Sequence, residues 1–457
     1  MTRTSMHTHL TMAGTALKLQ DGSIDAVDLV STAIRKSRAA RGVFISFIEW
    51  AHDDAVKSAH RRRSGAPLGR LDGIPFAVKD MIDVAGSRTT AGSITRIDSR
   101  PASRNAAVIT AMRAIGMIPV GKTNLSEFAF SGLGLNPHFG TPTADFHAAA
   151  PRAPGGSSSG SAIAVQRGLV TAAIGTDTAG SIRVPAAFNG LVGFRASTGR
   201  YDMDGVHPLA VTLDSLGPLT RTVEDCVLLD SAMRGRANPD VCATPLEQVR
   251  FVVDSSVLED PTLQPDVARN VRSVVTRLRE RGARVEERPV EAFKRTRQAI
   301  ATQGWLGAIE AWSLLQQVVE GERGDQIDRR VRNRLLAAKG IDRHAEARIR
   351  TLRAELMLNM LHELGDAVLV TPAVKHVAPS LAALEADDSL FAATNLETLS
   401  LTMPGSLLDM PGVAMPSGVD REGLPTSVLF SVQQGHDDRL LCACLAVEST
   451  LMSRPTE

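Results

Sequence analysis

The sequence predicts an α/β protein, because segments with helical periodicity alternate along the chain with short apolar segments typical of buried strands. Residues 25–41 alternate apolar and polar side chains at helical spacing. Residues 74–78 form a short apolar run, which predicts a buried strand that carries Lys79 at its end. Further apolar runs at residues 169–174 and 191–194 are separated by Gly and Ser, and their length suits strands buried on both faces of a helix-covered sheet.

The remaining predicted elements follow the same alternation. Helices are expected at residues 52–63, 108–115, 162–169 and 267–281, and strands at residues 119–121, 246–253, 368–372 and 412–416. Residues 320–364 form a long Arg-rich region with helical texture and few turn signals, whose charges are typical of a solvated helix face. No repeat or linker is evident, and the length by itself permits one large domain or two.

Composition and charge argue against several classes of protein. The formal net charge of +1 gives no reason to expect a nucleic acid or an acidic membrane as partner. No segment approaches the roughly 20 apolar residues of a membrane span, and residues 1–20 lack the apolar centre of a secretion signal. We therefore expect a cytoplasmic protein.

The four cysteines are too few and too scattered for a disulfide framework. Cys442 and Cys444 have the spacing of two corners of a metal site, but no second Cys or His pair with ligand spacing accompanies them. We therefore expect buried apolar thiols, with no metal and no other cofactor.

The strongest chemical signal is a pair of Gly/Ser-rich motifs, residues 155–161 (GGSSSGS) and residues 175–185 (GTDTAGSIRVP). A flexible linker has such a composition, but here an apolar helix-like stretch and a strand-like run come between the motifs. A phosphate-binding loop would use backbone N–H groups at a helix N-terminus. Neither the Gly-Lys-Ser/Thr ending nor the G-x-G-x-x-G spacing is present, so this interpretation is disfavoured.

Residues 156–160 also match the G-x-S-x-G nucleophile elbow of α/β-hydrolases, with Ser158 as the nucleophile and His376 or His436 as candidate bases. An elbow directly follows a strand, whereas residues 148–154 have the Pro/Ala texture of a loop. We therefore disfavour the elbow.

The motifs together resemble the amidase signature family. Residues 155–199 match the family densely, and residues 71–80 (LDGIPFAVKD) resemble its lysine-bearing segment. Residues 89–93, 213–218 and 412–418 also resemble segments of the family. The resemblance implies one large domain over residues 1–457, with a signature core at about residues 71–200. Its expected fold is a mixed central β-sheet covered by helices on both faces.

The resemblance also implies a catalytic triad of Lys79, Ser157 and Ser181, with Ser181 as the nucleophile and Ser157 held by a cis peptide bond after Gly156. The residue types suit amide hydrolysis, because a serine hydroxyl attacks only when a base takes its proton. A lysine is a base only when neutral, and burial favours its neutral form. Ser157 can accept one hydrogen bond while it donates another, so it can pass the proton between Ser181 and Lys79. We expect these three side chains to form a chain of hydrogen bonds.

The resemblance implies an oxyanion hole made by the backbone N–H groups of Thr178, Ala179, Gly180 and Ser181. The family usually has Gly where this chain has Ala179, which is tolerable if its φ angle is negative. We expect Asp177 and Arg183 to brace the loop by hydrogen bonds rather than to bind substrate. Gly156 and Ser158 are expected to support the site in the same way.

Residues 127–134 resemble the family's loop beside the acyl pocket, which makes Phe130 and Ser131 candidate substrate contacts. Equally, Phe128 and Phe130 could be ordinary core residues. The expected substrate is a small-molecule amide, and the Arg-rich region at about residues 290–365 is a candidate cap over the pocket. A homodimer is a common arrangement in the family.

Two other functions stay open. The glutaminase subunit (A-type) of a tRNA-dependent amidotransferase belongs to the same family, but it typically has Gln at the position of Val184 and Leu-Lys-Pro-Thr-Tyr-Gly at residues 194–199. A catalytically inactive member that acts as a binding protein is disfavoured because Lys79, Ser157 and Ser181 are all present.

Overall fold

One mixed β-sheet runs through the molecule. The computed structural model describes residues 11–144, 146, 150–341 and 343–452, and within these ranges eleven strands pair in the order β1-β3-β2-β4-β6-β5-β10-β11-β9-β7-β8. Strand β2 pairs in parallel with both of its neighbours, β3 and β4, and β7 pairs in parallel with β8 and β9. The strands between β4 and β9 in this order pair antiparallel. The predicted mixed sheet is therefore confirmed. The strands are β1 (Phe44–Phe47), β2 (Pro75–Lys79), β3 (Ile118–Thr123), β4 (Ala172–Asp177), β5 (Val192–Arg195), β6 (Ser215–Thr220), β7 (Arg250–Asp254), β8 (Arg284–Arg288), β9 (Val368–Pro372), β10 (Gly412–Val419) and β11 (Pro425–Ser431).

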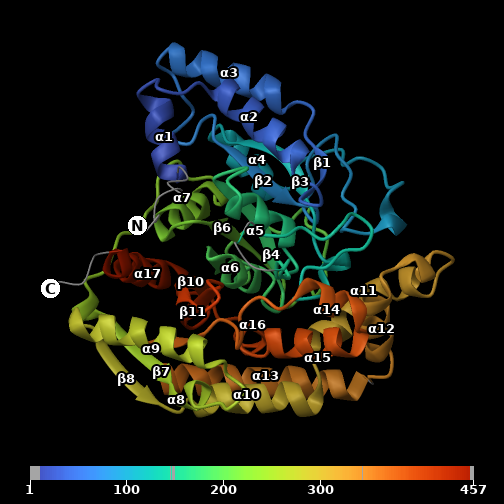
Figure 1. Ribbon diagram of the computed structural model, residues 1–457, viewed down its shortest axis with the longest axis vertical. Coiled ribbons are helices and arrows are strands. Elements are labelled where there is room, and N and C mark those ends of the chain that lie inside the picture. The colour runs from blue at the N-terminus through green and yellow to red at the C-terminus, as the bar shows by residue number, and fades with distance from the viewer. Residues whose placement is uncertain (1–10, 145, 147–149, 342, 453–457) are drawn as a thin grey trace.

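Helices cover the sheet on both faces, as Figure 1 shows, and complete the expected single α/β domain. Among the described residues, none of the helices is long and apolar enough to cross a membrane. The α-helices are α1 (Met12–Gln20), α2 (Ala26–Ala39), α3 (Ala51–Arg63), α4 (Ala107–Ala114), α5 (Ser159–Gln166), α6 (Arg183–Asn189), α7 (Val223–Met233), α8 (Ser255–Leu258), α9 (Pro265–Glu280), α10 (Glu291–Gln303), α11 (Leu306–Val319), α12 (Arg329–Ala338), α13 (Arg343–Leu364), α14 (Leu381–Ala386), α15 (Asp388–Leu399), α16 (Met403–Leu407) and α17 (Asp437–Met452). Short 3₁₀ turns are η1 (Ile94–Arg96), η2 (Glu127–Ala129), η3 (Leu246–Gln248) and η4 (Gly324–Gln326).

Local sequence explains several boundaries. The helix expected at residues 25–41 is α2, which starts after Asp25 because the Asp25 carboxylate accepts the Val27 N–H and caps the helix. The strand expected at residues 74–78 is β2, and all five of its residues are buried between its neighbours β3 and β4. The segment 148–154, expected to be a loop, lies partly outside the described residues. Residues 1–10 of the N-terminal segment and the chain end after residue 452 lie wholly outside them.

The helical region expected at residues 320–364 contains two helices, α12 and α13, with a break around Gly340. Glycine costs about 1 kcal/mol inside a helix relative to Ala. One expectation needs correction. The strand expected at residues 246–253 starts only at Arg250, because residues 246–248 form the 3₁₀ turn η3. Strand β8 escaped prediction because its side chains are charged and mostly exposed rather than alternately apolar.

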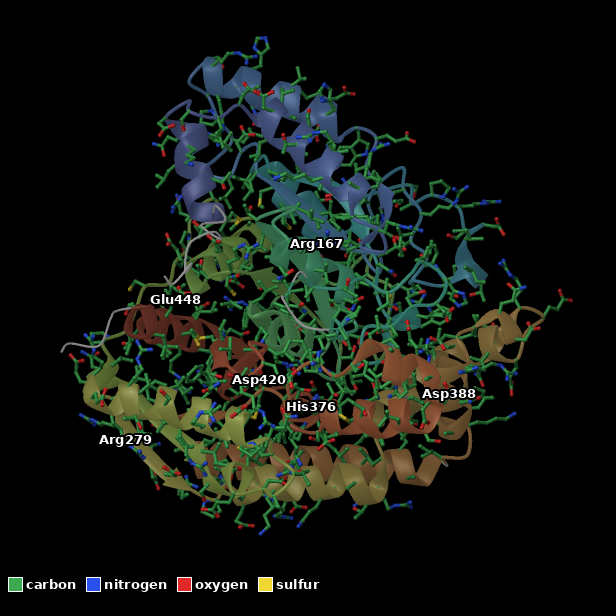
Figure 2. The ribbon with its side chains drawn as sticks, in the orientation of Figure 1. Arg167, Arg279, His376, Asp388, Asp420 and Glu448 are labelled. Carbon is green, nitrogen blue, oxygen red and sulfur yellow. The ribbon has the colours of Figure 1, made fainter. Side chains whose placement is uncertain are left out.

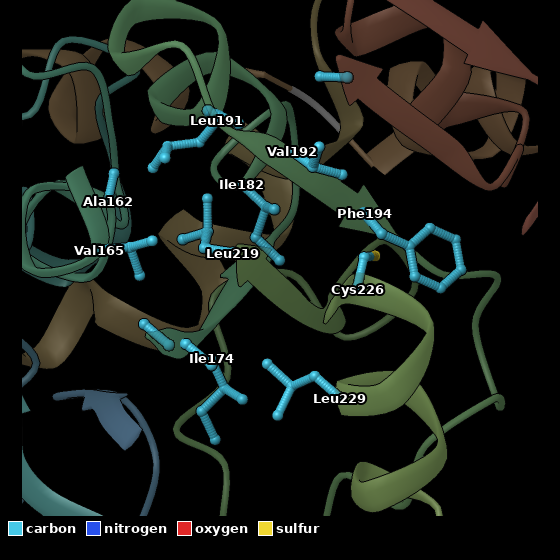
Figure 3. Packing of buried hydrophobic residues seen from close by; sticks show 14 of the residues in the cluster. Ala162, Val165, Ile174, Ile182, Leu191, Val192, Phe194, Leu219, Cys226 and Leu229 are labelled. Carbon is cyan, nitrogen blue, oxygen red and sulfur yellow. The ribbon is translucent and has the colours of Figure 1, made fainter. Parts of the chain in front are cut away.

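Part of the main hydrophobic core packs against the Gly/Ser-rich motifs. Figure 3 shows Ile174, Ile182, Phe194 and Leu219 packed together with apolar side chains of α5 and α7. Ile182, the residue after Ser181, is fully buried. The turn that carries Ser181 is therefore anchored by hydrophobic burial immediately next to it.

Candidate active site

The lysine predicted as the base is fully buried at the end of β2. The Nζ atom of Lys79 lies 2.7 Å from Ser157 Oγ, 2.7 Å from Thr176 Oγ1 and 3.3 Å from the Thr176 carbonyl oxygen. A neutral amine has two N–H donors and one lone pair. The carbonyl of Thr176 can only accept and its hydroxyl can also accept, so both donors can be used on Thr176. The lone pair then faces the hydroxyl of Ser157.

Burial sets the protonation state of this lysine. Desolvation lowers the pKa of Lys79 from 10.5 to about 7, although the negative charges of Asp177 and Asp214 act in the opposite direction. A substantial fraction of Lys79 is therefore neutral near neutral pH. This is the form in which an amine can take a proton.

Ser157 is fully buried and follows a cis peptide bond with Gly156, as the family resemblance implied. Its carbonyl oxygen accepts the N–H of Ser126 at 3.1 Å. The next residue, Ser158, donates its N–H to the carbonyl of Ser181 at 3.1 Å and its hydroxyl to the carbonyl of Thr176 at 3.3 Å. Ser158 thus ties the segment of Ser157 to Ser181 and to Thr176, the residue that contacts Lys79.

Ser181 lies in the turn between β4 and α6, where it lines a cavity. The expected hydrogen-bond chain is present in its first half, since Lys79 and Ser157 are in contact at 2.7 Å. Within the described residues, the hydroxyls of Ser157 and Ser181 share no hydrogen bond, so the second half is not formed. Catalytic hydrogen bonds are often longer in the absence of substrate.

Asp177 and Arg183 brace the turn around Ser181 with both side chains fully buried. The Asp177 carboxylate accepts the N–H groups of Gly180 at 2.8 Å and Ile182 at 3.1 Å, and it pairs with the Arg183 guanidinium at 2.9 Å. Burial alone would raise the pKa of Asp177, but Arg183 and Arg195 together with these hydrogen bonds lower it to about 2. The bracing carboxylate is therefore ionised at neutral pH.

The same contact changes the expected oxyanion hole. The N–H of Gly180 donates to Asp177 at 2.8 Å, so it is not available to a substrate. Within the described part of the chain, the N–H groups of Thr178, Ala179 and Ser181 have no protein acceptor. Three of the four expected donors are therefore free.

The backbone of this turn accommodates Ala179. Its φ angle is not positive, so the alanine is unstrained where the family usually has glycine. Gly180, by contrast, has a φ angle of 141°, and a Cβ atom there would lie 2.3 Å from Thr402 Oγ1. Thr402 also donates its hydroxyl to the Ala179 carbonyl at 2.6 Å. Glycine is required at position 180 and not at position 179.

A mostly apolar cavity of about 250 Å³ opens beside Ser181. Phe130 is buried in its wall, and Ser131 lines it while donating its hydroxyl to Asn395 at 3.1 Å. Phe128 and Phe130 both belong to the main hydrophobic core, so the alternative interpretation as core side chains holds for both, although Phe130 also lines the cavity. Helices α11 and α12 of the Arg-rich region contribute Gly307, Ala308, Arg334 and Ala337, and the rest of the wall includes Leu209, Trp305, Ala392, Leu396, Leu399 and Met403.

Arg334 is the cation in this wall. Its guanidinium donates to the carbonyl of Phe130 and lies over the Phe130 ring, with 4.6 Å from the guanidinium carbon to the ring centroid. Among the described residues no carboxylate lies within 4.0 Å of it, and burial lowers its pKa to about 10. Even so, Arg334 remains charged at neutral pH.

Sequence reasoning missed several residues of the site. Thr176 precedes Asp177 in the recognised motif, and its contact with Lys79 could have been anticipated from the motif's position at the end of a strand. Asp214 accepts the Thr178 hydroxyl at 2.6 Å and also lies in a recognised segment. Trp305 and Arg334 come from segments without any motif, and no signal in the sequence identifies them.

The nucleophile elbow gains no support from the geometry. His376, which is labelled near the middle of Figure 2 and is buried, contacts the Val377 carbonyl at 2.9 Å and the Thr398 hydroxyl at 3.0 Å. The hydroxyl of Ser158 donates to Thr176 and to neither histidine. Cys444 is buried in the main core, Cys442 is half-buried, and no cluster of metal-ligating side chains occurs in the described ranges.

Comparisons with known proteins establish the family. The family model described as Amidase matches residues 27–441, so the chain belongs to the amidase signature family. It is 30% identical to 2-amino-5-chloromuconic acid deaminase of Comamonas testosteroni over 97% of this chain and 96% of that protein. It is 33% identical to mandelamide hydrolase of Pseudomonas putida, over 86% and 81% of the two chains.

The chain is also similar to an amidotransferase subunit and to a solved amidase structure. A glutamyl-tRNA(Gln) amidotransferase subunit of Pseudomonas fluorescens is 30% identical over 95% of this chain and 96% of that protein. A crystal structure of an amidase superposes with a TM-score of 0.84 at 28% identity and covers 96% of this chain and 99% of that one. Family and fold together identify an amide-hydrolysing enzyme.

Proposed function

We propose that the protein hydrolyses a carboxylic amide through an acyl-enzyme on Ser181, with Ser157 and Lys79 as the proton relay. The observation that carries the proposal is the buried Lys79, whose pKa is lowered to about 7 and whose Nζ lies 2.7 Å from Ser157 Oγ. A desolvated lysine that is hydrogen-bonded to a serine, with no carboxylate within 4.0 Å in the described ranges, is suited to general-base catalysis.

The proposed reaction has two stages. In the first, Ser181 Oγ bonds to the amide carbon while its proton passes through Ser157 to Lys79. The C–N bond then breaks, and the leaving nitrogen takes the proton back from Lys79 through Ser157. In the second stage a water molecule attacks the ester and gives its proton to the same relay, and the carboxylic acid is released with Ser181 restored. The products are the acid and ammonia or an amine.

Charge on the carbonyl oxygen would be stabilised by the free N–H groups of Thr178, Ala179 and Ser181. These donors are held in place by the Asp177 bracing contacts, so they need little reorganisation when the charge develops. We further propose that α11 and α12 cap the substrate pocket, since Gly307, Ala308 and Arg334 contribute to its wall.

The test is ammonia release from a panel of amides by the purified chain. Wild-type protein should turn over at least one amide, whereas Ser181→Ala should release no ammonia above background. Ser158→Ala is the matched control, because it removes a neighbouring hydroxyl that the relay does not use. Loss of activity in Ser158→Ala with retention in Ser181→Ala would reject the assignment and support the elbow.

A second candidate is the glutaminase subunit of a tRNA-dependent amidotransferase, which the full-length similarity to an amidotransferase subunit favours. Val184 and residues 194–199 depart from that subunit's typical sequence. A stand-alone cytoplasmic amidase should act on amides without partner subunits. Glutamine as the single productive substrate, and only with partner subunits added, would favour the second candidate. Size-exclusion chromatography of the same preparation would show whether the chain forms a homodimer.

A further inference from the structure

A second chamber adjoins the cavity at Ser181. The cavity itself holds about 250 Å³, and the chamber next to it holds about 740 Å³. The two share Trp305, Leu396 and Met403 in their walls, so they lie on either side of these three residues. Figure 1 shows the helices that build the chamber, α10, α15 and α16, close together in the lower half of the molecule. The small cavity accommodates an amide group and a few carbons, and anything longer has room in the chamber.

Trp305 lines both spaces, and its position is fixed by the start of a helix. It directly precedes α11, and a Cβ atom on Gly307 would lie 2.4 Å from the indole Nε1. The absence of a side chain at Gly307 therefore lets the indole lie against the first turn of the helix. Leu396 lines both spaces and is 61% exposed, so it adds apolar surface beside Trp305.

The chamber is lined by cations and by no described acidic residue. Lys294 and Arg297 lie one helical turn apart on α10, next to the apolar side chains of Ile300 and Ala301. Such a wall combines an apolar surface with a cationic end. An amphiphilic molecule with an anionic terminus complements both features.

The two cations of this wall differ in how they are paired. Arg297 lies 3.1 Å from Asp260, but the same carboxylate is 2.7 Å from Lys375 Nζ, so one acid serves two cations. Lys294 contacts Glu291 at 3.4 Å with both side chains about half exposed, and exposed pairs of this kind contribute little. Arg297 also acts on the charge of Asp254. Lys294 is therefore the cation of this wall that is most available to an anionic ligand, because its pair with Glu291 is exposed and weak.

We propose that the chamber is a distal substrate subsite and that the substrate is an elongated monoamide of a dicarboxylic acid. This inference rests on the proposed amide hydrolysis. The amide carbon lies at Ser181, the apolar chain passes Trp305, and the far carboxylate binds Lys294 and Arg297. The bond that breaks is the terminal amide C–N bond, with water as the co-reactant and the dicarboxylate and ammonia as products.

The experiment measures kcat/KM for primary monoamides of straight-chain dicarboxylic acids, from succinic to sebacic acid, and for unbranched alkanamides of matching length. Among the monoamides, kcat/KM should rise with chain length to a maximum. At that length the monoamide should exceed the matching alkanamide about tenfold or more, as expected for a hydrogen bond to a charged group.

Charge-removing variants locate the carboxylate. Lys294→Gln and Arg297→Gln should each lower kcat/KM for the preferred monoamide about tenfold, chiefly through KM, and leave the shortest monoamide within about twofold. Arg295→Gln is the matched control, since it removes one charge from the same helix at a residue that pairs with Glu355 outside the chamber. Lys294→Gln disturbs only a surface pair, so it remains informative if Arg297→Gln fails to fold.

A preference for the shortest monoamide, unchanged in Lys294→Gln and Arg297→Gln, would overturn the proposal and assign the carboxylate to Arg334 in the cavity. Equal activity on monoamides and alkanamides, or equal losses in Arg295→Gln, would overturn it as well. In each of these cases Ser181-dependent ammonia release would persist, so the proposed hydrolysis would stand without the subsite. Absence of ammonia release from every amide would instead reject both.

Discussion

Replacing Lys79 with methionine keeps a long unbranched side chain in the buried site and removes the amine that faces Ser157. General-base catalysis typically contributes about 10²–10⁴-fold to a rate, so we expect Lys79→Met to lower kcat/KM by a factor in that range. The preferred amide from the ammonia-release panel is the substrate for this assay. Circular dichroism of both proteins should show that the fold is retained.

The pH profile tests the same assignment. Because only neutral Lys79 can accept a proton, kcat/KM of the wild type should rise with pH along a limb near pH 7, which is the pKa of Lys79 in the folded protein. Below the limb, activity should fall about tenfold for each pH unit. His376 cannot account for such a limb, because burial lowers its pKa below 6.5. Lys79→Met should lose the limb.

The same pKa shift predicts a change in stability. Between pH 7 and pH 10.5 an unfolded lysine binds a proton that the folded Lys79 has released, so the free energy of unfolding rises with pH in this window. The slope reaches about 1.4 kcal/mol per pH unit. From pH 7 to pH 9 the wild type should therefore gain about 2 kcal/mol relative to Lys79→Met, in which this group is absent. Urea unfolding of both proteins at the two pH values measures the difference.

Near-full turnover in Lys79→Met, or an unchanged limb in that variant, would show that another group is the base. A stability difference independent of pH would show that Lys79 is not desolvated in the folded protein. Either result contradicts the neutral lysine on which the mechanism depends.

Three further predictions concern the surroundings of the nucleophile. A fluorophosphonate should label Ser181, as peptide mass spectrometry would show, and labelling of Ser158 would restore the elbow interpretation. Exhaustive chelation should leave turnover unchanged, because side chains supply both nucleophile and base; loss of activity that zinc restores would contradict the relay. Asp177→Asn should lower the free energy of unfolding by about 3–5 kcal/mol, because it leaves the buried Arg183 without its charged partner. Asp366→Asn is its control: it removes an exposed carboxylate and should change the urea midpoint little.

The sequence by itself determined the parts of this protein that depend on neighbouring residues. Apolar runs of strand length predicted the buried strands β2 and β5, because burial on both sheet faces demands continuous apolar side chains. The bracing of the turn at Ser181 was also predicted from the sequence, because Asp177 contacts Gly180 and Arg183, which are only a few residues away in the chain. Strand β8 was not predicted, because an exposed charged strand at the sheet edge has no apolar pattern.

Only the tertiary structure decided the properties that depend on residues far apart in the chain. The pKa of Lys79 follows from desolvation by several elements, and no local pattern encodes the amount of water excluded. The sequence could not show that the Gly180 N–H is unavailable to an oxyanion, because this depends on the geometry of the turn, in which that N–H donates to Asp177. Trp305 and Arg334 reach the cavity from segments far beyond Ser181 in the chain, and packing rather than sequence motif brings them there. The identity of the reactive residues is therefore readable from local motifs, whereas the pKa of Lys79 and the shape and charge of the substrate pocket arise from long-range packing.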